Sequence, residues 1–551
     1  MKSKRIFDFA LGSSAALFAV LGLGCSSLWN SDSEKSLVPD TAGNSPNYWC
    51  SWLTQNATLV ERDKAADKLK FAGDQGAASA RENIGDAQIF AQGGWIDDFA
   101  PIRKDMYFVF DDGWDVRPGM NPATEGYLFG SLELDEAKFP SCADKSPAER
   151  LKKLNEKVKA RGWRGAGIWV AAQCARKSGG ETVTAQAERE YWKQRVLWSK
   201  YAGVEYWKVD WGTRGSDVAF RKMLTDLGRE YYPDLIIEHT MPRGPVNALY
   251  FNSERGKFEG RGNMFNDGEN LLGGVRGVLA FSDTVRIYDT ISPIGVASAF
   301  DRTAWHLVEG EKSGGCGIVN AEDDLYFGAA LGCSLGVMRT ARAKPSALDV
   351  EFRGLRMTEV VRAVRWQRIA PAFGLDKSKT LISENRLEDD WTFRDGETWW
   401  KEAWGRNLRQ NAPAAVARNL PLPKVSSAEG DLPFVAASMH PNGSIAVAFV
   451  SRLNAGKGMY FPKAGVSLDT PDAAGRKIGV FGYFDSLTVN VGKKPARVLA
   501  QDLASDTPRD ITAECSYSDG KLTVFGKTAQ SLCKPASPND KSEPAIVLSV
   551  E

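Results

Sequence analysis

The chain has 551 residues, of which 43% are hydrophobic and 25% are charged, and it contains 17 Trp residues. A chain of this length and apolar content can bury a large core, and we expect two domains. Lys and Arg (70) balance Asp and Glu (69), so the net charge of +1 gives no reason to expect nucleic acid or another polyanion as a partner. The many Trp side chains suit sugar rings, although most of them must serve core packing.

The amino terminus has the pattern of a targeting segment. Basic residues precede an apolar stretch over residues 9–24, which ends in small residues directly before Cys25. The stretch is short for a membrane-spanning helix and favours a signal peptide. It resembles a bacterial lipobox, so we predict a lipoprotein signal peptide over 1–25 with Cys25 lipidated, although simple secretion remains an alternative. Residues 26–47 are predicted to be a linker. The protein would then be exported and anchored to the bacterial cell envelope through lipid alone, on its periplasmic side or at the cell surface.

Cysteine and histidine spacing gives no sign of a metal site. Export permits disulfides, and Cys515 and Cys533 flank a predicted hairpin, which makes them the preferred pair. The chain has no Cys-x-x-Cys and no His-Glu-x-x-His, and its three His residues are scattered. We therefore expect neither a metal nor a cofactor.

From residue 48 onward, predicted strands alternate with predicted helices. The strands lie at 48–52, 106–110, 166–170, 205–212, 235–238 and 278–286, with weaker candidates at 316–319 and 335–338. The segments between them have helical spacing, for example 147–160, 188–201 and 297–309. This alternation predicts a (β/α)8 TIM barrel over residues 48–374.

The remaining residues, 375–551, have a different pattern. Short alternating strands are separated by Asp-Gly, Asn-Gly and Pro-rich turns. This pattern predicts a C-terminal antiparallel β-sandwich domain that packs against the barrel.

Acidic residues follow several of the predicted barrel strands. Asp111 and Asp112 end the second strand, Asp210 the fourth and Glu238 the fifth, while Asp289 follows the sixth. Each alone is more often a loop cap or a surface charge, but the carboxyl ends of barrel strands meet at one mouth. Lys208 lies two residues before Asp210, so strand periodicity points both side chains the same way. A carboxylate pair without metal ligands indicates acetal hydrolysis.

Motifs in the first half of the chain resemble the α-galactosidases of glycoside hydrolase family 27. They are the segments 49–52 (Trp-Cys-Ser-Trp), 111–114 (Asp-Asp-Gly-Trp), 130–132, 138–140, 167–169 and 208–210 (Lys-Val-Asp). The resemblance covers about residues 48–300. Three features depart from that pattern. Gly212 replaces a Cys, the spacing from Arg286 to Asp289 is one residue short, and Asp283 after a Ser is similar to the related family 36.

The resemblance implies an exported retaining glycoside hydrolase that acts on α-galactosides, or a similar sugar, in an oligosaccharide or polysaccharide substrate. It implies Asp210 as the nucleophile and Asp289 as the acid/base, with Asp283 as the alternative. It further implies a set of sugar-binding side chains: Trp49 and Trp169 as apolar walls, and Asp111, Asp112, Lys208, Glu238 and Arg286 toward hydroxyl groups. Two alternatives stay open: a catalytically inactive glycan-binding surface lipoprotein, and a relative specific for β-L-arabinopyranosides or α-glucans.

Overall fold

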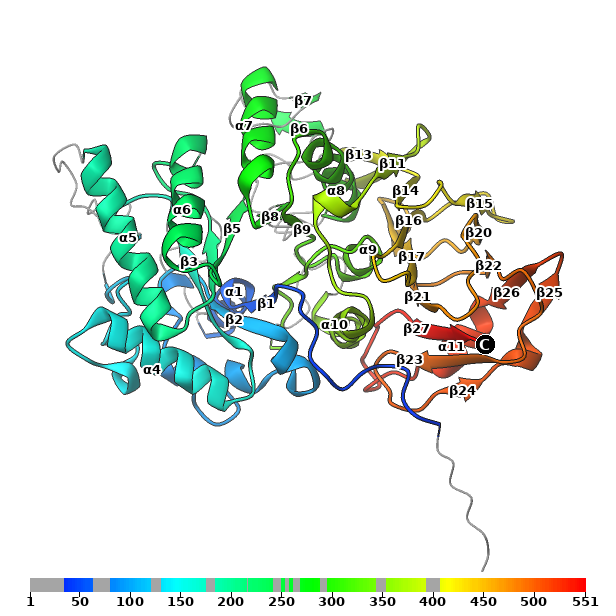
Figure 1. Ribbon diagram of the computed structural model, residues 1–551, viewed down its shortest axis with the longest axis horizontal. Coiled ribbons are helices and arrows are strands. Elements are labelled where there is room, and N and C mark those ends of the chain that lie inside the picture. The colour runs from blue at the N-terminus through cyan, green and yellow to red at the C-terminus, as the bar shows by residue number, and fades with distance from the viewer. Residues whose placement is uncertain are drawn as a thin grey trace, which may run out of the picture. The chain divides into compact units, whose positions relative to one another are not determined.

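A sheet of eight parallel strands forms the first half of the described structure (Figure 1). Its strand order is β10-β1-β2-β3-β4-β5-β8-β9, and a parallel bridge between Asn320 and Ser334 connects the two ends of this sheet. The chain therefore closes a barrel, as the alternation of strands and helices predicted. The strands are β1 (Asn47–Cys50), β2 (Met106–Phe110), β3 (Gly165–Val170), β4 (Tyr206–Val209), β5 (Ile236–Thr240), β8 (Thr284–Arg286), β9 (Ile318–Asn320) and β10 (Gly336–Val337).

The computed structural model describes residues 34–551, apart from 63–79, 120–129, 175–183, 216, 241–248, 253–256, 261–267, 288–294, 343–352 and 393–406. Cys25 and Asp289 lie outside the described residues. No helix within the described residues is both long and apolar enough to cross a bilayer.

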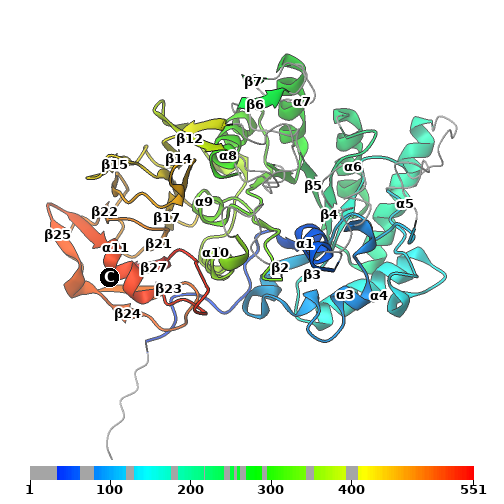
Figure 2. The same cartoon turned by 180° about the vertical axis from the view of Figure 1, so that it is seen from behind.

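Helices surround the barrel strands, as both ribbon views show (Figures 1 and 2). They are α1 (Trp52–Arg62), α3 (Asp86–Ile89), α4 (Pro147–Ala160), α5 (Ala185–Ala202), α6 (Val218–Tyr231), α7 (Gly268–Phe281), α8 (Gly295–Lys312), α9 (Leu325–Ala330) and α10 (Thr358–Ile369). A short hairpin of β6 (Leu249–Asn252) and β7 (Lys257–Gly260) follows β5. Side-chain caps begin two of the helices: Thr184 accepts from Ala187 N–H before α5, and Asp217 accepts from Phe220 N–H before α6.

The predicted sixth strand is wrong in its first half. Residues 278–281 belong to α7, and the strand is confined to Thr284–Arg286. Val275, Val278 and Leu279 are buried at helical spacing, so the apolar run packs one face of a helix onto the barrel. A short apolar run fits a buried strand or a buried helix equally well, and only its neighbours decide between them.

Strand periodicity decides which side chains enter the barrel. Tyr48, Cys50, Tyr107 and Tyr206 form one buried cluster inside the barrel. Trp49 lies between two inward residues of β1, so it points outward into the helical layer and contacts Phe108 and Trp163 instead.

The segment before β1 is packed against the rest of the fold, although 26–47 was predicted as a linker. Leu37 N–H donates to Gln501 Oε1 (2.6 Å), and Gly43 N–H donates to Asp105 Oδ1 (2.8 Å). Val38 and Ser45 are buried. The linker prediction is therefore wrong over 36–47, because buried side chains and tertiary hydrogen bonds hold this stretch in place.

The second half of the chain forms two larger packed β-sheets and two hairpins, β12–β13 and β18–β19. The larger has the order β11-β14-β16-β17-β21-β27-β23-β24, and the smaller has the order β15-β20-β22-β26-β25. Most neighbouring strands are antiparallel as predicted, but β14–β16, β17–β21 and β20–β22 are parallel. The bounds are β11 (Thr380–Ile382), β12 (Arg386–Thr392), β13 (Asn407–Pro413), β14 (Ala415–Arg418), β15 (Lys424–Ser426), β16 (Phe434–Met439), β17 (Ile445–Val450), β18 (Arg452–Asn454), β19 (Gly458–Tyr460), β20 (Gly465–Leu468), β21 (Lys477–Phe481), β22 (Ser486–Asn490), β23 (Val498–Asp502), β24 (Arg509–Asp510), β25 (Ser516–Ser518), β26 (Lys521–Phe525), α11 (Gly526–Leu532) and β27 (Ala545–Val550).

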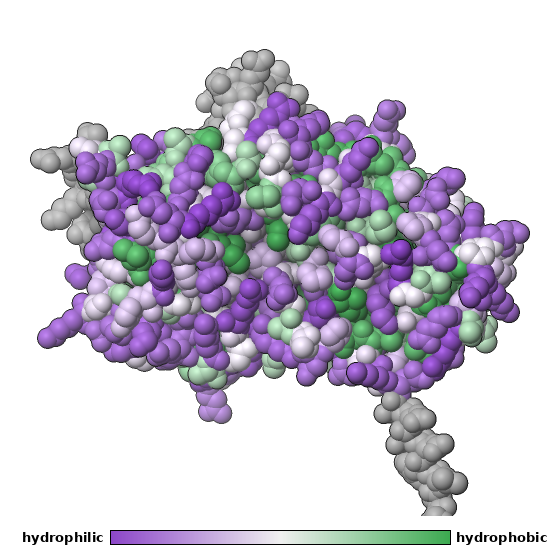
Figure 3. All heavy atoms as spheres, in the orientation of Figure 1, coloured by the Kyte–Doolittle hydropathy of each residue, from purple (hydrophilic) through white to green (hydrophobic). Residues whose placement is uncertain are grey.

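The larger sheet is buried on both faces. Ala437, Val447 and Ile546 face the smaller sheet, whereas their strand neighbours Ala436 and Val547 join the apolar core of the barrel. Helices α9 and α10 lie between the barrel strands and this sheet in both ribbon views (Figures 1 and 2). The space-filling view shows a mostly hydrophilic face with scattered apolar patches (Figure 3).

The predicted disulfide between Cys515 and Cys533 is not formed, and both are free thiols. Helix α11 follows the β25–β26 hairpin and separates Cys533 from it. The Cys533 thiol instead donates to the carbonyl of Ala545 in β27 (3.6 Å).

Candidate active site

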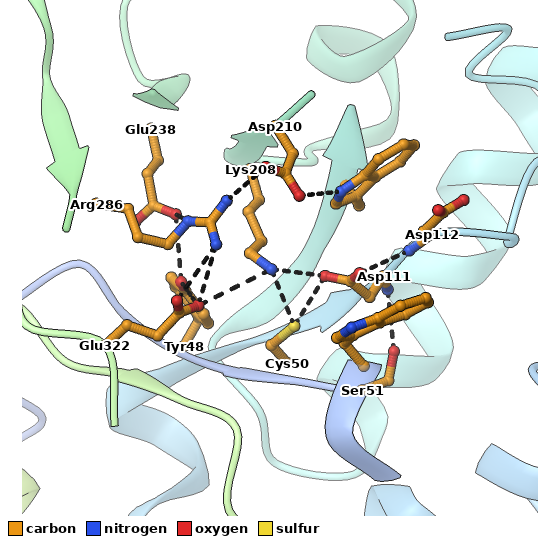
Figure 4. A network of polar contacts seen from close by, with 12 residues as sticks. Tyr48, Cys50, Ser51, Asp111, Asp112, Lys208, Asp210, Glu238, Arg286 and Glu322 are labelled. Atoms are coloured by element: carbon orange, nitrogen blue, oxygen red, sulfur yellow. Dashed lines mark hydrogen bonds and ion pairs between the residues drawn. The ribbon is translucent and has the colours of Figure 1, made fainter. Parts of the chain in front are cut away.

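Charged side chains fill the carboxyl end of the barrel interior (Figure 4). Asp111, Asp210 and Glu322 lie just after β2, β4 and β9, and Lys208, Glu238 and Arg286 belong to β4, β5 and β8. All six are at most 6% exposed. Burial of so many charges is costly unless they are paired, and here each contacts an opposite charge.

Asp210 is the most exposed of these carboxylates, at 6% against 3% for Asp111 and 0% for Glu238 and Glu322. The indole N–H of Trp169 donates to its Oδ2 (3.1 Å), and Arg286 Nη2 lies 3.1 Å from its Oδ1. Its backbone is fixed as well, because Arg221 of α6 donates to its carbonyl oxygen (2.9 Å). The carboxylate is thus held in one orientation by an N–H donor and a cation.

Arg286 contacts three carboxylates, one through each nitrogen of its guanidinium group. Nη2 faces Asp210, Nε lies 3.3 Å from Glu238 Oε1, and Nη1 lies 3.3 Å from Glu322 Oε2. A planar fork held at three points has no freedom to rotate. The side chain is fully buried, and its Nη2 forms an ion pair with Asp210.

Lys208 forms the second centre of positive charge. Its Nζ lies 2.8 Å from Asp111 Oδ2, 3.4 Å from Cys50 Sγ and 3.9 Å from Glu322 Oε1. Burial and Arg286 lower the pKa of Lys208, but Asp111, Cys50 and Glu322 outweigh them and hold the pKa well above its ordinary value. Lys208 therefore stays cationic.

The Cys50 thiol donates to Asp111 Oδ2 (2.9 Å). Burial, followed by the charge of Asp111, raises the pKa of this thiol well above its ordinary value. Cys50 is therefore a neutral donor rather than a nucleophile.

Glu238 is fully buried among polar side chains. Its Oε2 accepts from Tyr206 (2.7 Å) and Asn320 (2.6 Å), and its Oε1 accepts from Tyr48 (3.2 Å) and lies beside Arg286. Tyr206 and Asn320 donate to one oxygen of this carboxylate, and the Tyr48 hydroxyl, which also lies 3.2 Å from Glu322 Oε1, contacts the other. Burial raises the pKa of Glu238, and Arg286 opposes that effect. In this structure Glu238 forms an ion pair with Arg286, and its contact with a sugar stays a prediction.

Asp112 lies beside this network and pairs with a cation outside it. Arg81 Nε donates to Asp112 Oδ2 (2.8 Å), and Asp112 Oδ1 has no hydrogen-bond partner in the described part of the chain. Burial raises the pKa of Asp112 to about 7, against the opposing effect of Arg81. The carboxyl group can thus exchange a proton near neutral pH.

The structure separates two predicted site residues, Trp49 and Asp283, from the barrel mouth. Trp49 faces the helical layer, where its indole N–H donates to the carbonyl of Arg339 (3.0 Å), so it forms no wall for a sugar. Asp283 precedes β8 and therefore lies at the amino end of the barrel, where it accepts from Arg229 (3.0 Å) and from Ile237 N–H (3.2 Å). The alternative assignment of Asp283 as acid/base is wrong for this reason. Asp289 falls outside the described residues.

Trp169 does reach the site, but it is 1% exposed and contributes an N–H donor rather than an open wall. Its ring meets that of Trp211 edge-on, with 5.9 Å between centroids. Trp211 is half-buried and follows Asp210 directly, so its ring is the more accessible of the two.

Sequence reasoning missed Glu322, Tyr48 and Asn320. The rule that identified Asp210 would have found Glu322, since it follows β9 and shares the parity of Ile318 and Asn320. The predicted seventh strand, 316–319, ends three residues before Glu322 and so does not point to it. No group of three or more His, Cys, Asp or Glu side chains in the described ranges has the arrangement of a metal site.

No family model and no curated protein matches the chain. Among solved structures, the chain is similar to the α-galactosidase of Saccharomyces cerevisiae, with 10% identity, 92% of this chain and 94% of that chain covered, and a TM-score of 0.37. A candidate α-galactosidase/melibiase from Bacteroides fragilis has 11% identity, with 92% of this chain and 79% of that chain covered and a TM-score of 0.36. A candidate α-N-acetylgalactosaminidase from Bacillus halodurans has 10% identity, with 94% of this chain and 100% of that chain covered and a TM-score of 0.37. TM-scores this low establish no shared fold, so the barrel assignment rests on the strand pairing described above.

Proposed function

We propose that the protein is an exported retaining glycoside hydrolase that cleaves terminal α-galactosides or a stereochemically similar sugar. The orientation of Asp210 carries this proposal. Asp210 is the most accessible carboxylate of the network and is held by Trp169 and Arg286 at the end of β4. A nucleophile of this kind must be anionic, oriented and reachable by the anomeric carbon.

The acid/base would be Asp289, which follows Arg286 by three residues in the sequence. Asp111 and Asp112 would accept hydrogen bonds from the hydroxyl groups of the glycone, and Trp211 would line it. Export through the amino-terminal segment and lipidation of Cys25 belong to the same proposal.

A hydrolysis screen tests the proposal. Aryl α-galactoside, β-L-arabinopyranoside and α-glucoside are offered side by side, and the anomer first released is identified by proton NMR. We expect one glycoside to be cleaved with retention, and Asp210→Asn to lower turnover by about 10⁴-fold or more, because no covalent intermediate can form. Absence of cleavage with measurable oligosaccharide binding would favour the inactive glycan-binding protein, and inversion would contradict the double displacement.

A further inference from the structure

We propose that Glu322 is a positioning residue that holds Arg286 and Lys208 in place and sets the charge balance at Asp210. The proposal rests on the function proposed above and adds to it a residue outside the resembling motifs.

Glu322 is the one carboxylate in the described network that contacts both buried cations. Its Oε2 lies 3.3 Å from Arg286 Nη1, and its Oε1 lies 3.9 Å from Lys208 Nζ. Tyr48 also donates to Oε1 (3.2 Å). Figure 4 shows Glu322 on the opposite side of Arg286 from Asp210. Arg286 is thus shared between the two carboxylates, and Glu322 limits how strongly Arg286 binds Asp210.

The backbone after Glu322 is fixed from outside the barrel. Asp323 has a φ of 59°, in the left-handed region that non-glycine residues rarely adopt. Its carbonyl accepts from Arg339 Nη2 (2.9 Å), and its Oδ1 accepts from Met338 N–H and Arg339 N–H (both 3.2 Å). This turn directs Glu322 into the barrel and Asp323 away from it.

That support extends to the C-terminal sheets. Arg339 Nη1 lies 2.7 Å from Glu359 Oε2 of α10, and Glu359 Oε1 accepts from Glu543 N–H just before β27 (2.9 Å). Each of these side chains is at most 6% exposed. The orientation of Glu322 therefore depends on packing between the two halves of the fold.

The charge at Glu322 has a predictable effect on Asp210. The described charged or titratable groups that face Glu322 are Lys208 on β4, Arg286 on β8 and Tyr48 on β1, and those that face Asp210 are Arg286 and Arg221 of α6. Removal of a negative charge from this network makes ionisation of Asp210 easier. It also frees one side of Arg286, which loses its fixed orientation.

Two substitutions separate the effect of the negative charge of Glu322 from the effect of its side-chain length. For Glu322→Gln we expect the acid limb of kcat/KM to move about one pH unit lower and kcat to fall about tenfold or more. Glu322→Asp keeps the charge but is one methylene shorter. We expect it to lower kcat while its acid limb stays within about 0.3 pH units of that of the wild type.

Asp502→Asn is the matched control. Asp502 forms another buried ion pair, with Arg362 (2.8 and 2.9 Å), and does not contact Asp323 or Arg339. We expect this variant to lower Tm and to leave the acid limb unchanged. An equal pH shift in Asp502→Asn, or no shift in Glu322→Gln, would overturn the proposal. If Glu322→Gln does not fold, wild-type kcat in Glu322→Asp would overturn it.

A second readout does not depend on activity. Carbodiimide with glycine ethyl ester labels protonated carboxyl groups, and peptide mass spectrometry measures labelling of Asp210 as a function of pH. We expect the midpoint of labelling to fall in Glu322→Gln and to stay unchanged in Asp502→Asn. If the labelling midpoint of Asp210 falls in Glu322→Gln but the hydrolysis screen shows no cleavage, the proposed function is rejected and the role of Glu322 is kept. An unchanged midpoint would reject the role of Glu322.

Discussion

At the scale of single residues, each of the two buried cations at the barrel mouth contacts more than one carboxylate. Arg286 is divided among Asp210, Glu238 and Glu322, and Lys208 lies between Asp111 and Glu322. Removing one member of such a set costs more than its own contacts, because the partner left behind is a buried unpaired charge. Asp210, the least buried of these carboxylates, therefore has its orientation determined by groups that a substrate need not contact.

Burial of Asp112 gives a stability prediction with a definite sign. Its pKa of about 7 in the folded protein lies above its ordinary value, so the folded state binds the extra proton and loses stability as pH rises from about 4 to 7. Asp112→Asn removes that loss. The free energy of unfolding of the variant minus that of the wild type should rise by on the order of 2 kcal/mol when the pH is raised from 5 to 8.

Urea unfolding at the two pH values measures this difference. Asp226→Asn serves as the control, because Asp226 pairs with Lys222 on the exposed side of α6 and carries no burial cost. An effect of pH on Asp112→Asn no larger than on this control would show that Asp112 is ionised without penalty.

At the scale of elements, sequence periodicity predicted the barrel because its strands are short, apolar and each followed by a helix. It failed where an apolar run fitted both periods, as at 278–281, which packs as the end of α7. It also could not show depth along the barrel axis. Glu238 and Asp210 both lie near strand ends, but register places Glu238 opposite Lys208, below Asp210. Depth depends on how neighbouring strands are staggered, which a single strand does not encode.

The loop after β4 contains a glycine that the structure requires. A Cβ atom at Gly212 would lie 2.6 Å from the carbonyl oxygen of Ala172 and 2.8 Å from its nitrogen, both backbone atoms. Gly212→Ala would force the two loops apart and move Trp211, whose carbonyl accepts from Ala172 N–H (2.9 Å).

We expect Gly212→Ala to lower kcat/KM by about 100-fold, since small displacements of an oriented nucleophile have effects of that size. Its far-UV circular dichroism should remain that of a folded protein. Gly273→Ala in α7 is the matched control, because a Cβ atom there meets nothing within 4 Å. That control should keep full activity and gain about 0.5–1 kcal/mol of stability. Wild-type kinetics in Gly212→Ala would show that the loop can move without disturbing Asp210.

At the scale of the whole molecule, the sequence predicted a sandwich beside the barrel but not how closely the two are joined. Strands such as β17 (Ile-Ala-Val-Ala-Phe-Val) are apolar on both faces, as is typical of a strand covered on both sides. The sequence shows such a run but not what covers it. Here one face packs on the smaller sheet and the other on the barrel helices.

Arg418 provides the test of that interface. It is fully buried on β14 and donates to the barrel carbonyls of Leu331 and Gly374 (both 2.9 Å), with its guanidinium carbon 3.8 Å from the centroid of the Phe373 ring. Burial lowers its pKa to about 10, so it remains cationic at neutral pH. Arg418→Met would leave several buried carbonyl groups without a donor, and we expect it to cost about 3–5 kcal/mol.

We expect calorimetry of the wild type to show one cooperative transition, because separating the two halves would expose the apolar face of the larger sheet. Arg418→Met should lower the Tm of that single transition, and Arg418→Lys should lower it less, since an ammonium group can satisfy only part of the carbonyl set. Lys527→Met, a surface substitution on α11, should change Tm by much less than either substitution of Arg418. Two resolved transitions in the wild type would mean that the barrel and the C-terminal sheets unfold independently. That result would also contradict the inference that the C-terminal sheets support the orientation of Glu322.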